Sequence, residues 1–289
     1  MGTLYIVGTP IGNLEDMTFR AVRILQAVDL IAAEDTRHTG KLLQHFEIKT
    51  PQISYHEHNR TERLPELLQE LGEGKAIALV TDAGMPGISD PGYELVKACI
   101  EAGIQVVPIP GATAGITALS AAGLPTDRFV FEGFLPASGG ERQKRLESLQ
   151  AESRTLILYE SPHRIRATLQ DLAKSLGANR SIVLGRELTK LHEQFWRGRI
   201  FEAIAHYTSE EPKGEFTLVV AGASAGMAVL SDEELKAELL QIMREGVSRS
   251  QASRQLAQLT QLSRRKLYQL ALSIPGSDIE AAKEDLAQT

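Results

Sequence analysis

Asp82 stands at the end of an apolar run, residues 77–80 (Ile-Ala-Leu-Val), which predicts a buried strand. Glycines and prolines recur through residues 83–92, and a helical pattern begins only from about Asp90. In open α/β sheets, ligands bind at loops on the carboxyl ends of strands, where glycines let the backbone approach the ligand closely. We therefore expect a ligand site to which Asp82 contributes a carboxylate. The alternative is an ordinary strand–helix connection in which Asp90 caps the helix.

Similar polar or glycine-rich loops follow four further predicted strands. The strands span residues 4–7, 29–33, 52–54 and 105–109, and the loops after them span 8–13, 34–38, 56–60 and 110–114. Short apolar runs alternate with helical patterns, which predicts an α/β fold with a mainly parallel sheet covered on both faces. In such a sheet these loops meet at one edge. The 8–13 loop lacks the pattern G-x-G-x-x-G, so a dinucleotide-binding fold is not supported.

The chain of 289 residues is long enough for two or three domains. We place an N-terminal α/β domain at 1–125 and a second, smaller α/β domain at 126–222. The second domain has predicted strands at 129–134, 155–159, 181–185 and 216–221, and a polar, basic loop at 138–145 that enters a helix. Residues 222–230 are mostly small and predict a linker, and residues 231–289 form a helical third domain.

The third domain carries a local concentration of positive charge. Residues 244–268 contain six Lys or Arg and one Glu. Ser248 and Gln251 match a capping box, and Ser263 precedes a helix that opens with Arg264, Arg265 and Lys266. Two short helices across a tight turn indicate a helix-turn-helix arrangement, which is common in nucleic-acid binding. The alternative is a three-helix module for dimerisation or docking.

Composition excludes several classes of protein. The one cysteine, Cys99, lies on the apolar face of a predicted helix, so we expect no disulfide framework and a reducing, cytoplasmic environment. We expect no signal peptide, because residues 1–8 lead directly into a predicted strand, and no apolar stretch reaches membrane-spanning length. The net charge of −6 opposes a globally basic nucleic-acid binder but is compatible with a local basic patch. We expect no metal site, because His38, His45, His56 and His58 have no cysteine beside them.

Taken together, the loops resemble one known family. The matching segments are 4–14, 33–37, 56–59, 82–84, 89–92, 108–111, 118–125, 131–136, 159–164 and 186–190. They resemble bacterial 16S rRNA 2′-O-methyltransferases of the tetrapyrrole methylase superfamily, over residues 4 to 222 and in the helix-turn-helix tail. The resemblance implies two α/β domains with the methyl donor, S-adenosylmethionine, in the cleft between them. It also implies a homodimer that methylates a cytidine ribose in the decoding region of 16S rRNA, free or within the 30S subunit.

The family's motifs imply donor contacts from both domains. They are Pro10, Asp82, Met85, Gly111, Thr113, Ala114, Tyr159, Glu187 and Ala221. Three donor loops depart from the family's usual pattern, which often has Pro at position 8, Thr-Pro-Leu at 85–87 and Pro-Ser at 112–113. The loops must hold sulfur, methyl carbon and attacking oxygen in line at contacts of about 3 Å.

A ribose hydroxyl attacks well only if its proton is withdrawn as it reacts. Candidate proton acceptors at strand ends are Glu34, Asp35, His56, His58 and Glu160, of which Asp35 and His58 are preferred. The alternative role of Asp35 is to cap a helix while paired with a neighbouring arginine. The alternative role of residues 56–59 is to shape a polar loop by hydrogen bonding.

Basic side chains near these loops are candidates for binding phosphates, which position RNA without reading its sequence. They are Arg37, Lys41, Arg60, Arg142, Lys144 and Arg145, together with Arg264, Arg265 and Lys266 in the tail. Each could instead be a solvated surface charge. We expect the RNA to be single-stranded or bulged, because its bases and 2′-hydroxyls are accessible there.

Two other functions remain open at this level. One is a tetrapyrrole methyltransferase acting on a small molecule, since a fold does not fix a substrate. The other is a non-catalytic ribosome assembly factor. The basic tail opposes the first and the intact donor loops oppose the second, and a donor-binding assay separates the enzymes from the assembly factor.

Overall fold

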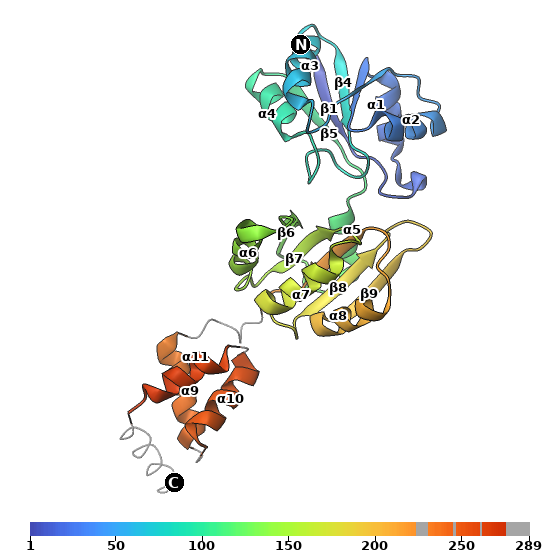
Figure 1. The fold of residues 1–289 in the computed structure, drawn as a ribbon. Helices are drawn as coiled ribbons and strands as arrows, with labels where there is room; N and C mark the ends of the chain where they lie inside the picture. Colours follow the sequence, from blue (N-terminus) through green and yellow to red (C-terminus); the bar gives the residue numbers. More distant parts are fainter. Residues whose placement is uncertain (224–230, 245–246, 261, 276–289) are drawn as a thin grey trace.

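The computed structural model describes residues 1–223, 231–244, 247–260 and 262–275. Over these ranges the chain forms two α/β units followed by a helical unit (Figure 1). Most of the predicted linker, residues 224–230, lies outside the described ranges. No helix within these ranges is both long enough and apolar enough to cross a membrane.

The first unit contains a sheet of five parallel strands in the order β3-β2-β4-β1-β5, which confirms the predicted α/β fold and parallel sheet. Its elements in chain order are β1 (Thr3–Val7), η1 (Leu14–Asp16), α1 (Phe19–Ala27), β2 (Leu30–Ala33), α2 (Thr36–His45), β3 (Gln52–Ser54), α3 (Arg60–Gly72), β4 (Ala76–Val80), α4 (Tyr93–Glu101) and β5 (Gln105–Ile109).

Both faces of this sheet are covered by helices, because side chains along a strand alternate between faces and both sets are apolar here. On β4, Ala78 and Val80 pack with α1 and α2, whereas Ile77 and Leu79 pack with α3 and α4. Figure 1 shows the two helix pairs on opposite sides of the sheet. As predicted, the side chain of Cys99 lies on the apolar face of α4 and is buried in the core.

The second unit contains a mixed sheet in the order β6-β7-β10-β8-β9, in which only β6 and β7 are parallel. Its elements in chain order are α5 (Ala114–Ala122), β6 (Phe129–Phe134), α6 (Gly139–Ser148), β7 (Thr155–Glu160), α7 (Ile165–Leu176), β8 (Ser181–Arg186), β9 (Gln194–Arg199), α8 (Ile200–Ser209) and β10 (Phe216–Val220). The second unit is α/β, as predicted, but its sheet is mostly antiparallel, unlike that of the first unit. The connection from β8 to β9 is too short for a crossover, so these strands pair antiparallel.

Two parts of the second unit differ from the sequence prediction. Strand β9 and helix α8 were not predicted, because β9 mixes polar, glycine and aromatic residues and only two of its side chains approach the core. Most of the segment 138–145, predicted as a loop, belongs to helix α6. Its apolar content is low, but Leu146 and Leu149 anchor it to the core.

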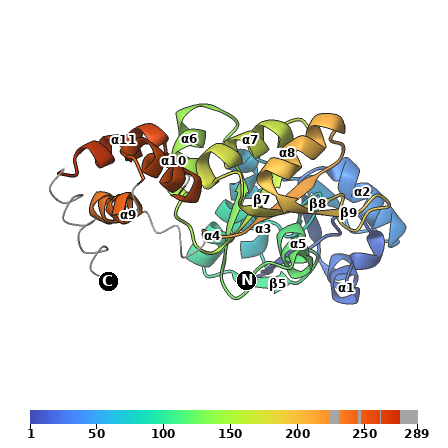
Figure 2. The same ribbon diagram turned by 90° about the horizontal axis from the view of Figure 1, so that it is seen from below.

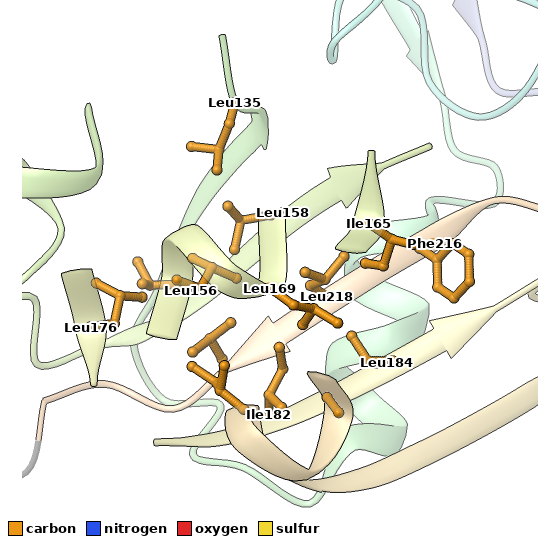
Figure 3. Packing of buried hydrophobic residues seen from close by; sticks show 14 of the residues in the cluster. Leu135, Leu156, Leu158, Ile165, Leu169, Leu176, Ile182, Leu184, Phe216 and Leu218 are labelled. Carbon is orange, nitrogen blue, oxygen red and sulfur yellow. The ribbon is translucent and has the colours of Figure 1, made fainter. Parts of the chain in front are cut away.

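Helices α6, α7 and α8 cover one face of the second sheet. Figure 3 shows Ile165, Leu169 and Leu176 of α7 packed against aliphatic side chains of the strands. Helix α5 covers the opposite face, where Ala118, Leu119 and Ala122 contact Ile157 and Val219. We assigned α5 to the first domain, but its packing joins it to the second sheet.

The third unit consists of α9 (Asp232–Arg244), α10 (Arg249–Thr260) and α11 (Arg264–Leu272). Figure 2 shows the three helices packed together, and their shared core includes Leu235, Leu239 and Leu267. The predicted caps are present: Ser248 and Gln251 exchange hydrogen bonds, and Ser263 Oγ accepts from Lys266 N.

Candidate active site

A cavity of about 410 Å³ lies between the two α/β units. Its first wall comes from loops at the carboxyl ends of β1, β4 and β5, three neighbouring strands. Its second wall comes from the ends of β6 and β7 and the start of β10. The lining residues are Ile11, Ala83, Gly84, Met85, Ile88, Ser89, Asp90, Thr113, Ala114, Phe134, Tyr159, Glu160, Ser161, Pro162, Glu215, Phe216 and Thr217. The cavity is mostly apolar with a few polar groups, as is typical of small-molecule sites of about 300–1,000 Å³.

The loops of the first wall are tied together through their backbones. Thr9 N donates to Gly84 O (2.9 Å), Gly84 N donates to Thr9 O (3.2 Å), and Thr9 Oγ1 donates to Thr81 O. Gly8 and Gly111 face each other so closely that a Cβ on Gly111 would lie 2.8 Å from Gly8 Cα. Glycine at both positions therefore allows the β1 and β5 loops to meet at the cavity.

Two departures from the family's usual pattern lie in contact. A Cβ built on Gly8 would lie 2.6 Å from Met85 Sδ. The same Cβ would lie 2.7 Å from Gly111 Cα, so the backbone of the β5 loop as well as the Met85 side chain restricts the space at position 8.

Carboxylates gather at the ends of β2 and β4. Glu34 Oε2 accepts from Asp82 N (3.2 Å). Burial raises the pKa of Glu34 against the lowering effect of the hydrogen bond from Asp82 N, and the neighbouring charges of Asp82 and Asp35 raise it further against a smaller effect of His56. Burial raises the pKa of Asp90 from its ordinary 3.8 to about 7, with further contributions from Glu34 and Asp82.

Asp90 is therefore a cavity carboxyl group that titrates near neutral pH. It does not cap α4, because the cap position is Gly92 and no side chain there makes a capping bond. From the sequence we considered Asp90 only as a helix cap, because its half-buried position arises from the folding of the 83–92 loop and has no local sequence signal.

The second wall is held by a buried polar network. Glu160 accepts from Ser161 N (2.8 Å) and Thr168 Oγ1 (2.6 Å) and lies 3.4 Å from Arg164. Tyr159 Oη accepts from Gly115 N (3.1 Å), which ties the end of β7 to the start of α5. These bonds fix the turn that follows β7 at the cavity edge.

Four of the donor contacts that the resemblance implied, Met85, Thr113, Ala114 and Tyr159, line the cavity. Ala221 is a correction. β10 runs antiparallel to β7, so its first residue, Phe216, pairs with Glu160 at the cavity, and Ala221 lies at the far end of the sheet. Phe216 and Thr217 take the place that we expected for Ala221.

The four other implied donor contacts, Pro10, Asp82, Gly111 and Glu187, lie beside the cavity and do not line it. Ile11 is the residue of the 8–13 loop that lines the cavity, next to Pro10, and Gly111 packs on Gly8. Asp82 is half-buried, and its Oδ1 has no hydrogen-bond partner within the described residues. Glu187 Oε1 accepts from Lys190 Nζ (2.9 Å) and Glu215 N (2.9 Å). These bonds connect Glu187 to Glu215, which does line the cavity.

The preferred proton acceptors occupy structural or remote positions. Asp35 caps α2, and its carboxylate accepts from Arg37 N (2.8 Å) and pairs with the Arg37 guanidinium (2.7 Å). The Arg37 side chain holds the pKa of Asp35 well below its usual range, which makes Asp35 a weak base. His58 is exposed, with its ring centroid 6.0 Å from that of His56. Glu160 lines the cavity but is engaged in its network.

The predicted phosphate-binding residues have different environments. Arg142 is a correction: it is buried and donates to Asp171 (2.9 Å), Pro136 O (3.0 Å) and Thr168 Oγ1 (2.8 Å), so it is inaccessible to RNA. Lys144 and Arg145 line an open groove of about 470 Å³ beside the cavity. The remaining candidates are exposed or half-buried side chains on α2, α3 and α11: Arg37, Lys41, Arg60, Arg264, Arg265 and Lys266.

Some of these cations have anionic or polar neighbours. Arg60 pairs with Glu57 and Glu94, and Lys266 pairs with Asp232 (3.0 Å). Arg264 donates to Ser250 Oγ (3.0 Å), whereas Arg265 forms no ion pair within the described part of the chain. Across the same part of the chain, no three His, Cys, Asp or Glu side chains are grouped closely enough to hold a metal ion.

The arrangement of two sheets with a cavity between them defines a known class of protein. The family model of the Tetrapyrrole (Corrin/Porphyrin) Methylases matches residues 3–204, and the chain belongs to this family. Among solved structures, uroporphyrin-III-C-methyltransferase from Thermus thermophilus aligns with a TM-score of 0.56 and 23% identity, over 76% of this chain and 94% of that one. The methyltransferase CobJ aligns with a TM-score of 0.59 and 19% identity, over 77% and 95%. These two structures support the fold.

Sequence comparison places the chain more narrowly, with the ribosomal RNA small subunit methyltransferases I. It is 64% identical over 275 residues to that enzyme of Synechocystis sp., which covers 95% of this chain and 99% of the relative. It is 49% identical over 280 residues to that of Escherichia coli O157:H7, which covers 95% and 96%.

S-adenosylmethionine is the methyl donor of this class, and the cavity fits it. The cavity has the volume of a small-molecule site and a mostly apolar lining. Beside it, the backbones of the β1 and β5 loops approach each other closely at Gly8 and Gly111. Thr81 Oγ1 and Asp82 Oδ1 are buried beside it and lack hydrogen-bond partners within the described residues. Such polar atoms are available to a ligand that carries amino and hydroxyl groups.

Proposed function

We propose that this chain transfers a methyl group from S-adenosylmethionine to the ribose 2′-hydroxyl of a cytidine in 16S rRNA. The observation that carries the proposal is the near-complete alignment with small subunit methyltransferases I combined with a cavity suited to the donor. The basic α11 favours this substrate over a small macrocycle, since a macrocycle has no use for such a helix.

The chain's own part in the reaction is to position the reacting groups and to take up the proton that leaves the ribose hydroxyl. S-adenosylmethionine supplies a methyl group on a sulfonium cation. The backbone of the β1, β4 and β5 loops fixes one wall, and the Glu160 network fixes the other. Rigid walls hold the reacting groups in line and so lower the entropic part of the barrier.

We propose Asp90 as the proton acceptor in place of Asp35 and His58. It lines the cavity, and its pKa near 7 suits proton removal at neutral pH. Glu34 and Asp82 support this role, because their charges help to raise the pKa of Asp90.

We also propose that Lys144, Arg145 and the basic end of α11 bind RNA phosphates. Lys144 and Arg145 border the groove next to the cavity, and Arg264 and Arg265 are exposed at the start of α11, where the helix dipole adds positive charge. The proposed substrate implies a cytoplasmic protein that binds 16S rRNA or the 30S subunit. We propose a homodimer, whose mass is measurable by light scattering.

Replacement of the two exposed arginines of α11 tests the role of the tail. The full-length double variant Arg264→Ala/Arg265→Ala is expected to bind 16S rRNA more weakly. The slope of log affinity against log salt concentration should fall in magnitude by about 1 for each phosphate that the variant no longer binds. Lys97→Ala, on α4, is the control for removal of an exposed cation. An unchanged salt slope in the double variant would assign the tail to protein docking.

The proposed function is tested by methyl transfer from labelled S-adenosylmethionine. The acceptors are 30S subunits and naked 16S rRNA that lack the modification, and the labelled nucleotide is mapped. Label on one cytidine 2′-oxygen supports the proposal and identifies the assembly state that is modified. Donor binding without transfer to either acceptor contradicts it in favour of a small-molecule substrate. Absence of donor binding contradicts both enzymatic functions.

A further inference from the structure

Strand β6 contains an irregularity that redirects one aromatic side chain. Phe131 pairs with Ile157 on β7, but the next pair is Gly133 with Leu158, so Glu132 is an extra residue. Gly133 has a φ of +60°, in the left-handed region that favours glycine. Such bulges recur near active sites, where they change the direction of a side chain.

The bulge places Phe134 on the cavity face of the sheet. Strict alternation from Phe131 would put residue 134 on the opposite face, among Leu156 and Leu158. Instead Phe134 pairs with Tyr159, and the centroids of their rings lie 5.6 Å apart in an edge-on arrangement. The bulge thus moves the Phe134 ring from a core position to the cavity face of the sheet.

Phe134 lies at the boundary between two hollows. It lines both the donor cavity and the groove that contains Lys144 and Arg145. It is 53% exposed, although a phenylalanine at this position could have been buried in the core. Gly133 approaches the other domain here, since a Cβ on it would lie 2.6 Å from Ser89 Oγ.

The groove beside Phe134 has the chemistry of a nucleotide site. Arg145 pairs with Glu132 (2.6 Å), which neutralises the buried carboxylate of the bulge. Lys144 forms no ion pair within the described residues, and Glu141 is the remaining acidic side chain of the groove. An exposed aromatic ring beside cationic side chains matches sites in which unpaired bases stack while phosphates are held nearby.

We propose that Phe134 is a stacking platform for an unpaired base of the RNA substrate, next to the methylated nucleotide. Stacking there places the ribose at the mouth of the donor cavity and selects RNA whose bases are splayed out of a helix. The proposal rests on the proposed function and adds a specificity-determining residue to it.

The test compares variants that keep or lose the aromatic ring. Phe134→Leu keeps the apolar character, whereas Phe134→Tyr and Phe134→Trp keep a ring. Methyl transfer to 30S subunits is measured at varied subunit and varied donor concentrations. We expect Phe134→Leu to raise the KM for the 30S subunit about tenfold, with Tyr and Trp within about twofold of wild type. Phe19→Leu, a 97% exposed phenylalanine on α1, is the matched control, and thermal unfolding verifies that each variant is folded.

Each alternative outcome has a definite meaning. An unchanged KM for the 30S subunit in Phe134→Leu overturns the stacking role. A rise in the KM for the donor alone assigns Phe134 to the donor site. Equal losses of methyl-transfer activity in all three variants indicate that Phe134 has a packing role. Both results also overturn the proposal. If the wild-type protein methylates neither 30S subunits nor 16S rRNA, the proposed function itself fails, and that result is independent of Phe134.

Discussion

Asp90→Asn is expected to lower kcat for methyl transfer by about 10²–10⁴-fold, the usual contribution of a positioned general base. Asparagine keeps the size and polarity of the side chain but cannot accept the proton of the ribose hydroxyl. Because Asp90 lines the cavity, the loss should appear in kcat, while the KM values for donor and RNA change little. Steady-state kinetics with labelled donor measures both.

The matched control is Asp35→Asn, which removes a carboxylate from a neighbouring strand end. Asp35 already accepts from Arg37 N and pairs with the Arg37 side chain, so this variant should affect the cap of α2 and leave kcat near that of wild type. A large fall in kcat for Asp35→Asn with none for Asp90→Asn would return the role of base to Asp35. A rise in the donor KM alone for Asp90→Asn would make Asp90 a counter-ion for the donor's positive charge.

The pH dependence supplies a second readout of Asp90. The active form of a base is deprotonated, so kcat/KM should rise about tenfold per pH unit below the pKa and level off above it. For the free enzyme this pKa is about 7.

The contribution of Asp90 to protein stability changes with pH in the opposite direction from kcat/KM. Since the folded-state pKa exceeds the ordinary 3.8, ionisation of Asp90 destabilises the fold, and its contribution to stability falls as pH rises from about 4 towards 7. Asp90→Asn should lack this part of the decline and melt at a higher temperature than wild type at pH 8.

The sequence predicted the first unit well because its signals are local. The runs at β1, β4 and β5 are apolar on both faces, and their glycine loops mark the cavity wall. The second wall depends on pairing between distant segments, which no short pattern specifies. Ala221 was misplaced because the direction of β10 relative to β7 determines which end reaches the cavity. Asp90 was recognised only as a cap because its raised pKa depends on burial in the folded loop and on the charges of Glu34 and Asp82 from other strand ends.

Arg142 shows the same limit for a charged residue, and its replacement carries the second large effect. Within the polar sequence of α6, nothing distinguishes it from Lys144 or Arg145. In the fold its guanidinium is buried against Asp171, Pro136 O and Thr168. Thr168 in turn donates to Glu160, so Arg142 completes the network behind the second wall.

Arg142→Ala is therefore expected to lower the free energy of unfolding by about 3 kcal/mol, because it leaves buried acceptors without their charged donor. Lys144→Ala, two residues along the same helix and exposed, should leave the unfolding free energy near that of wild type while weakening RNA binding. Chemical denaturation measures the first quantity and RNA titration the second. The salt slope of RNA binding should stay unchanged in Arg142→Ala, since the buried guanidinium binds no phosphate.

The opposite pattern, a stable Arg142→Ala with a reduced salt slope, would restore Arg142 to the RNA-binding surface.

The loss of the Arg142 side chain has a further expected consequence for catalysis. Arg142 and Arg164 both donate to Pro136 O, and Arg164 also donates to Leu135 O, directly after Phe134. Removal of the Arg142 side chain should therefore loosen the segment that presents the Phe134 ring. The KM for the 30S subunit should then rise in Arg142→Ala even at temperatures where the variant is fully folded, which links the buried network to the proposed RNA platform.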